Sequence, residues 1–240
     1  MPIVIENGID IGPGINIEGS SVVPPTLLLE LDATDYSGSG STWPANVGSN
    51  ATLNGVPGYT ASSPTYFSFD PLDVEYANVP DLGNLSTWTV EAWFRVTSSL
   101  TGQITSVITN EFDLVNDLNF SIGTNNAPGS YNIAVGYFNS GWHTTSGFAP
   151  TLNTWYYVAG TYDGSTVKQY NNGIFNTSVS GAGTPASGGE VRIARRWDSS
   201  ALSSNNFFPG DVAIVRVYSG AKDATAVTNS WNADKARFGY

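Results

Sequence analysis

The segment Trp88-Thr-Val-Glu-Ala-Trp-Phe-Arg-Val96 alternates in the character of its side chains. Successive side chains of a β-strand point to opposite faces of the sheet. Every second residue from Trp88 to Val96 is apolar, and Glu91, Trp93 and Arg95 fall on the other face. This period of two predicts a strand with its apolar face buried in a core.

Further strand patterns flank this segment. Residues Trp155–Tyr162 and Thr166–Tyr170 surround Asp163-Gly164, a dipeptide typical of tight hairpins. Other predicted strands and returns are Leu27–Leu31, the return at Asn172-Gly173, Val191–Ala194 and Val212–Tyr218. Many short strands separated by turn residues predict an all-β sandwich.

The C-terminal region carries the one helical pattern. Asp223 can cap the N-terminus, Val227 and Trp231 share one face, and Lys235 falls in the last turn. Nothing divides the chain after the linker, so we predict one sandwich domain over residues 26–240 with one short C-terminal helix.

Residues 1–25 differ from the rest and form a predicted extended arm with a linker. Gly8-Ile-Asp-Ile-Gly12 and Gly14-Ile-Asn-Ile-Glu18 repeat one pattern around Pro13, and Val22-Val-Pro-Pro25 follows. A hairpin this small is not stable alone. We therefore predict that it docks on a partner, or forms an edge strand of its own sandwich. The partner-binding candidates are Ile9, Ile11, Ile15 and Ile17.

Charge and composition exclude several classes of function. The net charge is −11, and residues 1–167 contain fifteen acidic side chains and one basic side chain, Arg95. Residues 168–240 contain eight basic and five acidic side chains. An acidic surface repels nucleic acid and anionic membranes, so we expect neither as a partner. Opposite charges at the two ends would let copies meet head to tail, although an unevenly charged, solvated surface is the simpler interpretation.

The scarcity of cysteine and histidine excludes several kinds of cross-link and metal site. The chain has no cysteine and one histidine, His143, which excludes disulfides, thiolate metal sites and multi-histidine metal sites. No segment has the pattern of a signal peptide or a membrane span, so we expect synthesis in a host cytoplasm.

Five motifs, in order, resemble the laminin G-like, concanavalin A-like family. They are Trp88–Phe94, Thr154–Val167, Tyr170–Gly173, Val191–Ala194 and Gly210–Tyr218. The resemblance extends over residues 27–238 and implies a jelly roll of two antiparallel sheets. The segments Leu29–Ala33 and Trp231–Gly239 further resemble the ends of laminin G-like proteins of tailed-phage virions. The arm resembles N-terminal segments of cyanophage structural proteins.

Some relatives of this fold cleave polysaccharides with paired glutamates, so an enzyme must be considered. The nearest segment has Glu111 and Asp113 but lacks the second glutamate, which Glu75 or Glu91 would have to supply from another strand. His143 lies in no Gly-x-Ser-x-Gly elbow. We therefore predict no enzymatic activity.

Many laminin G-like domains hold a calcium ion, and two segments offer oxygen ligands at loop spacing. They are Asp32–Asp35 and Asp70–Asp73. Neither has the full pattern of a calcium loop, and Ala213 stands where many relatives have an aspartate. We therefore predict no cofactor, with calcium as the open alternative.

Sugar sites stack exposed aromatic rings on pyranose rings and bond the hydroxyls with polar side chains. Candidate rings beside glycine, proline or polar residues are Trp43, Tyr59, Trp142 and Trp197. Packing in the core of the sandwich or over its faces is the alternative role for these rings.

The resemblance implies a phage virion structural protein, and we predict a capsid (head) decoration protein on the particle surface. Its arm would bind neighbouring subunits, with the major capsid protein and further copies of the chain as partners. The alternative is a carbohydrate-binding adhesin module of a tail or fibre that recognises host-surface glycans. A polysaccharide hydrolase ranks last.

Overall fold

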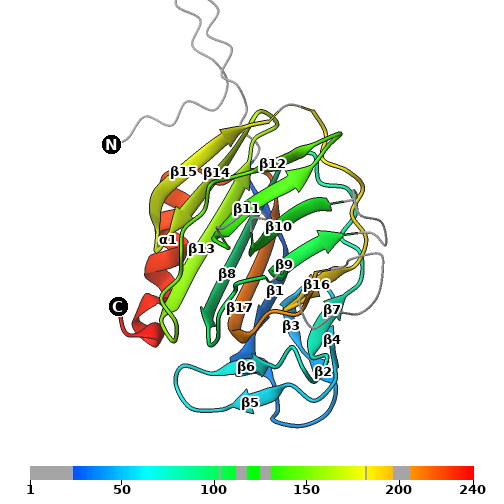
Figure 1. Cartoon of the computed structure of the whole chain (residues 1–240), viewed down its shortest axis with the longest axis vertical. Coiled ribbons are helices and arrows are strands. Elements are labelled where there is room, and N and C mark those ends of the chain that lie inside the picture. The colour runs from blue at the N-terminus through cyan, green and yellow to red at the C-terminus, as the bar shows by residue number, and fades with distance from the viewer. Residues whose placement is uncertain (1–23, 103, 112–117, 125–130, 182, 197–205) are drawn as a thin grey trace, which may run out of the picture.

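Two antiparallel sheets pack face to face around one core and form the predicted jelly-roll sandwich (Figure 1). The coordinates are a computed structural model that describes residues 24–102, 104–111, 118–124, 131–181, 183–196 and 206–240. The predicted arm and Ile9, Ile11, Ile15 and Ile17 lie outside the described residues. The boundary between residues 25 and 26 stays a prediction.

The larger sheet has, within the described chain, the order β15-β14-β13-β8-β17-β1-β3, with β6 beside β17 and β5 beside β6. The strands are Thr26–Asp32 (β1), Ala45–Val47 (β3), Gly58–Thr60 (β5), Tyr66–Phe69 (β6), Trp88–Val96 (β8), Trp155–Tyr162 (β13), Thr166–Asn171 (β14), Ile174–Ser180 (β15) and Gly210–Ser219 (β17).

The smaller sheet has, in the same described part, the order β12-β11-β10-β9-β16-β7-β4-β2. Its strands are Thr42–Trp43 (β2), Ala51–Asn54 (β4), Tyr76–Val79 (β7), Ser106–Glu111 (β9), Leu118–Thr124 (β10), Ile133–Phe138 (β11), Trp142–Thr144 (β12) and Val191–Ile193 (β16).

The alternation of β8 is confirmed on both faces. Its apolar side chains, from Trp88 to Val96, lie in the core between the sheets. Trp93 points the other way and lies in a second apolar cluster on the outer face of the larger sheet. The core between the sheets covers one face of β8 and the C-terminal helical segment covers the other, which explains why both of its faces are buried.

The C-terminal helix covers this outer face. Helix α1 spans Ala224–Asp234 and is followed by the 3-10 turn η3, Lys235–Phe238. The Asp223 side chain accepts a hydrogen bond from the amide of Ala226 at 2.7 Å, and Val227 and Trp231 are buried, as predicted. Figure 1 shows α1 behind β13, β14 and β15. None of the helices in the described residues is long and apolar enough to cross a membrane.

Two tight hairpins place β13, β14 and β15 side by side. Asp163 accepts hydrogen bonds from the amides of Ser165 and Thr166, and Gly164 has a φ of 94°. Asn172 and Gly173 both have positive φ, at 50° and 76°, which is the pattern of a type I′ turn. The predicted hairpin signals are confirmed.

Buried ion pairs tie the helix to the sheet. Arg216 of β17 bonds Glu30 of β1 at 2.6 Å and Asp234 at the end of α1 at 2.6 Å. Lys222 bonds Glu91 of β8 at 2.7 Å. These groups cover the outer face of the larger sheet and stabilise the fold there. A ligand-binding site is therefore expected on the outer face of the smaller sheet.

Candidate functional site

Trp142 is the exposed aromatic ring on the smaller sheet. It lies on the edge strand β12, its side chain is 47% exposed, and its ring makes an edge contact with Phe138 at 5.2 Å between centroids. The guanidinium carbon of Arg196 lies 4.7 Å from the centre of the Trp142 indole ring. Arg196 follows β16, so the contact joins groups from opposite sides of β9, β10 and β11.

Small polar side chains lie on the strands between these two groups. Phe120 and Ile122 of β10 point into the core, so Ser121 between them points to the outer face. Ser121 pairs with Gly136 of β11 and Thr109 of β9 in the strand register. Short side chains leave no bulk on these strands, which lets Arg196 reach the ring of Trp142.

An acidic group lies beside the arginines. The Glu111 carboxylate, at the end of β9, is 3.8 Å from Nε of Arg196. The side chain of Arg192 also donates to the main-chain oxygen of Glu111 at 3.4 Å. The Glu111 side chain is only 1% exposed, so it acts as a buried counter-charge for Arg196. The face thus combines an exposed indole ring with guanidinium donors, which are groups that bind a ligand rich in hydroxyls.

Glu111 does not form a glycosidase carboxylate pair with either Glu75 or Glu91 in the described structure. Glu111 lies on β9 of the smaller sheet, whereas Glu91 lies on the outer face of the larger sheet and pairs with Lys222. Glu75 precedes β7 and accepts from the amide of Asp70 at 2.8 Å. Asp113 lies outside the described residues. Nucleophile and general acid must flank one bond, and these groups come from separate parts of the fold.

His143 has a packing role. Its ring stacks on Tyr137 at 4.8 Å between centroids. A Cβ added at Gly181 would lie 3.1 Å from the imidazole, so the backbone there closes over the ring. This agrees with the interpretation of His143 as an ordinary strand residue.

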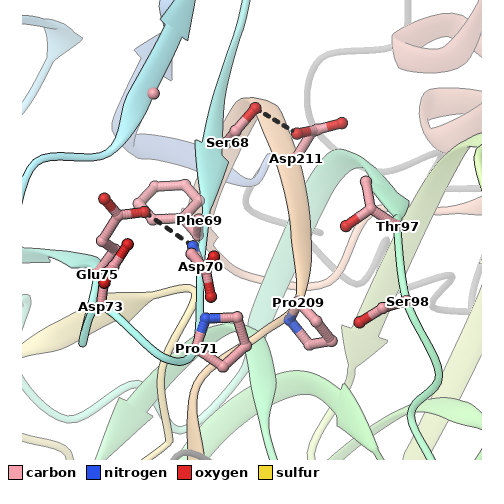
Figure 2. A pocket seen from close by; sticks show the side chains of 11 residues that line it. Ser68, Phe69, Asp70, Pro71, Asp73, Glu75, Thr97, Ser98, Pro209 and Asp211 are labelled. Carbon is pink, nitrogen blue, oxygen red and sulfur yellow. Dashed lines mark hydrogen bonds between the residues drawn. The ribbon is translucent and has the colours of Figure 1, made fainter.

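A pocket of about 480 Å³ lies where β6 and β8 end and β17 begins (Figure 2). Its described lining includes four carboxylates, from Asp70, Asp73, Glu75 and Asp211. Burial raises the pKa of Glu75 above its ordinary value, and the nearby carboxylates of Asp73 and Asp70 add to the effect. Figure 2 shows Ser68 donating to Asp211, a bond of 2.6 Å. Trp and Tyr are absent from the described lining, so the pocket lacks a stacking ring.

The candidate calcium segments do not fit a cation. Both Asp32 oxygens accept from Arg237, at 2.5 and 2.9 Å, and Asp35 accepts from Asn46 at 2.8 Å. Asp70 uses one oxygen to accept from the amide of Leu72. Across the described part of the chain, the acidic and histidine side chains form no group of three that could hold a metal.

The bonds of Asp32 also predict how the free energy of unfolding depends on pH in acid. Burial acts to raise the pKa of Asp32, but hydrogen bonds from Arg237 and Thr34 outweigh it and hold the pKa below 3.8, its ordinary value. A carboxylate with a lowered folded-state pKa stabilises the protein above its unfolded-state pKa, and the contribution is lost as the pH falls through the folded value.

We expect Asp32→Asn to lower the free energy of unfolding at pH 7 by about 2 kcal/mol. Urea unfolding at pH 7 and at about pH 3 should show the gap to the wild-type protein narrowing in acid. The exposed residue Asp35 provides the control, since Asp35→Asn should change little at either pH. A gap that stays the same at both pH values would contradict this account.

Three other rings were candidates for stacking on sugars. Trp43 is fully buried and donates from its indole nitrogen to the main chain of Asp32 at 3.0 Å, so its assignment to a site is wrong. The Tyr59 ring is half-buried against Tyr36 and Phe67 and is committed to packing. Trp197 lies outside the described residues.

Sequence reasoning identified Trp142 but missed its arginine partner. Arg192, Arg195 and Arg196 form a sparse basic cluster in the sequence, yet nothing local connects them to residue 142. The two segments lie on either side of β9, β10 and β11 in the smaller sheet, and their side chains meet across these strands. A basic cluster directly after a core strand is the one signal that could have indicated this position.

Comparison with known proteins agrees with this fold. Residues 73–228 match the family model of the concanavalin A-like lectin/glucanases superfamily. Among solved structures, domain 4 of AbnA, an extracellular GH43 arabinanase from Geobacillus stearothermophilus, solved with arabinotriose, has a TM-score of 0.61 at 18% identity. That alignment covers 85% of this chain and 98% of the domain.

Two other solved structures show the same sandwich in larger proteins. The binding domain of botulinum neurotoxin serotype G has a TM-score of 0.63 at 12% identity, over 88% of this chain and 52% of that one. The sialidase of Trypanosoma rangeli, in complex with the inhibitor DANA, has a TM-score of 0.54 at 14% identity, over 89% and 34% of the two chains. The chain therefore spans about half of the toxin domain and a third of the sialidase.

The search of curated proteins found no match. At such low identities the solved structures show the fold alone. The family model, however, covers well over half of the sequence, and its fold is the one described above. The chain belongs to the concanavalin A-like lectin/glucanases superfamily.

Proposed function

We propose that this chain is a non-catalytic carbohydrate-binding protein whose binding surface surrounds Trp142. One observation carries the proposal: an indole ring that is 47% exposed lies at the edge of the smaller sheet, with the guanidinium of Arg196 over it. An exposed tryptophan costs free energy in water and gains it when a sugar ring covers it.

The neighbouring groups supply the polar half of such a site. Arg196, whose side chain is 14% exposed, carries N–H donors for the hydroxyls of a sugar beside the ring, and the buried Glu111 carboxylate orients that guanidinium. Domain 4 of AbnA, which has the same fold, was solved with arabinotriose, which supports a glycan as the class of ligand.

Replacing Trp142 with alanine tests this proposal. We expect a glycan array to identify ligands of the wild-type protein, and Trp142→Ala to weaken the best one by about tenfold or more. The free energy of unfolding should change by less than about 0.5 kcal/mol, because the ring is half exposed.

Phe175 supplies the matched control. It is also an exposed aromatic, at 53%, but it lies on β15 of the other sheet. Phe175→Ala should leave glycan binding unchanged. Equal losses in both variants, or unchanged affinity in Trp142→Ala, would overturn the assignment of the surface.

We further propose that the protein is a virion structural protein, displayed on a phage head as a decoration protein and anchored by residues 1–25. The support is the repeated Gly-Ile-polar-Ile pattern, which no sandwich strand shares, together with the resemblance of the arm and the sandwich ends to virion proteins. The partners would be the major capsid protein and further copies of this chain. Many copies on a lattice would make weak glycan contacts effective through avidity.

Gold labelling of purified particles with an antibody against the sandwich tests this second proposal. Label over the head would support decoration, and removal of residues 1–25 should then abolish attachment. Label on the tail alone would favour the adhesin of a tail or fibre. Particles without label would overturn the virion role and leave the glycan proposal standing.

A further inference from the structure

The sheet edges differ in length. Within the described residues, the smaller sheet ends in β12 and β2, and the larger sheet ends in β15 on one side and in β3, with β5 nearby, on the other. Strand β15 has seven residues, whereas β2, β3, β5 and β12 have two or three. Short edge strands offer too few unpaired backbone groups to bind another chain, and β15 is long enough to do so.

The sequence of β15 also lacks the charged residues and prolines that usually keep an exposed edge strand from pairing with another chain. Its sequence, Ile-Phe-Asn-Thr-Ser-Val-Ser over Ile174–Ser180, contains no charge and no proline. Ile174 is 73% exposed and Phe175 is 53% exposed. Proteins normally protect edges of this length with lysine, proline or a covering segment. The ladder with β14 has one register shift, between Gln169 and Tyr170, but the edge has no charged side chain, and its exposed apolar side chains are suited to the addition of a strand.

We propose that β15 is the acceptor for the arm of a second copy of this chain, which adds the first repeat of its predicted hairpin, residues 8–12, to the larger sheet as a further strand. This inference rests on the proposed anchoring role of the arm and names the surface that the arm binds.

The side-chain pattern of the arm fits this edge. Ile9 and Ile11 share one face of an extended strand, with Asp10 on the other. On β15, Phe175 contacts Tyr170 on the side of the helix, and Val179 packs against the core on the other side. Phe175 and Val179 thus lie on opposite faces of the sheet. Whichever face Ile9 and Ile11 occupy in the added strand, an apolar side chain of β15 lies on that face.

The acidic arm meets no repulsion at this edge, and one cation lies on the neighbouring strand. Residues 1–23 contain Glu6, Asp10 and Glu18 and no basic side chain. Strand β15 has no charge to oppose them, and Lys168 of the neighbouring β14 lies opposite Ser178 in the register.

Geometry favours a second copy over the same molecule. One row of paired residues crosses the larger sheet from Thr26 to Val179, through Ser219, Trp88, Tyr162 and Val167. Five strand spacings separate the ends of this row, about 24 Å. To pair with its own β15, the arm would have to cross this distance and reverse direction. Pro24 and Pro25 fix extended backbone where the arm leaves the sandwich.

Cysteine cross-linking tests the proposal directly, because the natural chain has no cysteine. Two full-length variants, Ile11→Cys and a size-tagged Ser178→Cys, are mixed under mild oxidation. We expect the mixed dimer to form at least about fivefold faster than with Asn46→Cys, which lies on the short edge strand β3. Adding Asn176→Lys to the Ser178→Cys chain should reduce the product, since a charge now protects the edge.

Each alternative has its own outcome. Equal rates with Ser178→Cys and Asn46→Cys would overturn β15 as the acceptor. A third variant carries both Ile11→Cys and Ser178→Cys in one chain. If its cross-link formed within the same molecule at every dilution, the proposal that the arm comes from a second copy would be overturned. The assay contains neither particles nor glycans. Cross-linking without attachment to particles would count against the virion role alone, whereas attachment without cross-linking would count against this inference alone.

Discussion

Replacing Trp93 with alanine is expected to lower the free energy of unfolding by about 4 kcal/mol. Trp93 is fully buried on β8, and its indole ring lies nearly parallel to the rings of Trp231 and Phe238, at 4.9 and 3.9 Å between centroids. Removing it leaves a cavity between the larger sheet and α1 and removes both ring contacts. Urea unfolding followed by circular dichroism measures the loss.

A conservative variant separates volume from chemistry. The indole nitrogen of Trp93 has no hydrogen-bond partner among the described residues, so Trp93→Phe loses volume but no hydrogen bond. We expect Trp93→Phe to cost about 1.5 kcal/mol, well under half of the alanine variant. The exposed Trp142 gives the second comparison, since Trp142→Ala should leave stability nearly unchanged. Equal costs for Trp93→Phe and Trp93→Ala would contradict the cavity explanation.

The central strands could be predicted because their signal is local. In β8 the period of two extends over nine residues, which fixes the strand and both of its faces. The hairpin dipeptides Asp163-Gly164 and Asn172-Gly173 demand positive φ, and they have it. The capping residue and spacing of α1 are equally local. Each of these patterns depends on residues within a few positions of one another.

The short strands of the smaller sheet could not be predicted in the same way. Strand β2 has two residues and β4 has four, too few for a period to show. Trp43 illustrates the consequence. Its neighbours in sequence are polar or proline, which suggested exposure, yet Phe67 packs against its ring at 4.7 Å. That contact joins segments 24 residues apart and is invisible to local reasoning.

The candidate site is non-local for the same reason. Trp142 and Arg196 are 54 residues apart, and three strands of the smaller sheet lie between them. Sequence composition indicated that exposed aromatics would be present, and the family resemblance indicated a sandwich. Only the three-dimensional course of the smaller sheet and its side chains shows that the Trp142 ring meets Arg196.

The two outer faces of the sandwich are differently used. The larger sheet carries α1, an apolar cluster and the ion pairs of Arg216 and Lys222, so its surface is filled by the chain itself. The described chain places no helix on the smaller sheet, which carries Trp142 and Arg196. If this division holds, changes at the first face should affect folding without affecting binding, and changes at the second should do the reverse.

Arg216 provides the sharpest test of the first face, and we expect Arg216→Met to cost about 3 kcal/mol of stability. Burial alone would lower the pKa of Arg216, but the hydrogen bonds to Asp234 and Glu30 raise it well above its ordinary value. The side chain therefore stays charged and joins β1, β17 and the end of α1. Removing it leaves the Asp234 carboxylate, which is 8% exposed, without its counter-charge.

Two further variants decide whether the cost comes from the orphaned carboxylates. In the double variant Arg216→Met with Asp234→Asn, one buried charge is removed along with its partner, so part of the stability should return. Lys235→Met is the control, because the side chain of Lys235 bonds only the neutral, exposed Asn232 among the hydrogen bonds found in the described chain, and the change should cost less than about 0.5 kcal/mol. Glycan binding should survive in all three variants, since Arg216 lies on the opposite sheet from Trp142. A loss of binding in Arg216→Met at a temperature where the protein remains folded would show that the two faces are coupled and that the proposed division is wrong.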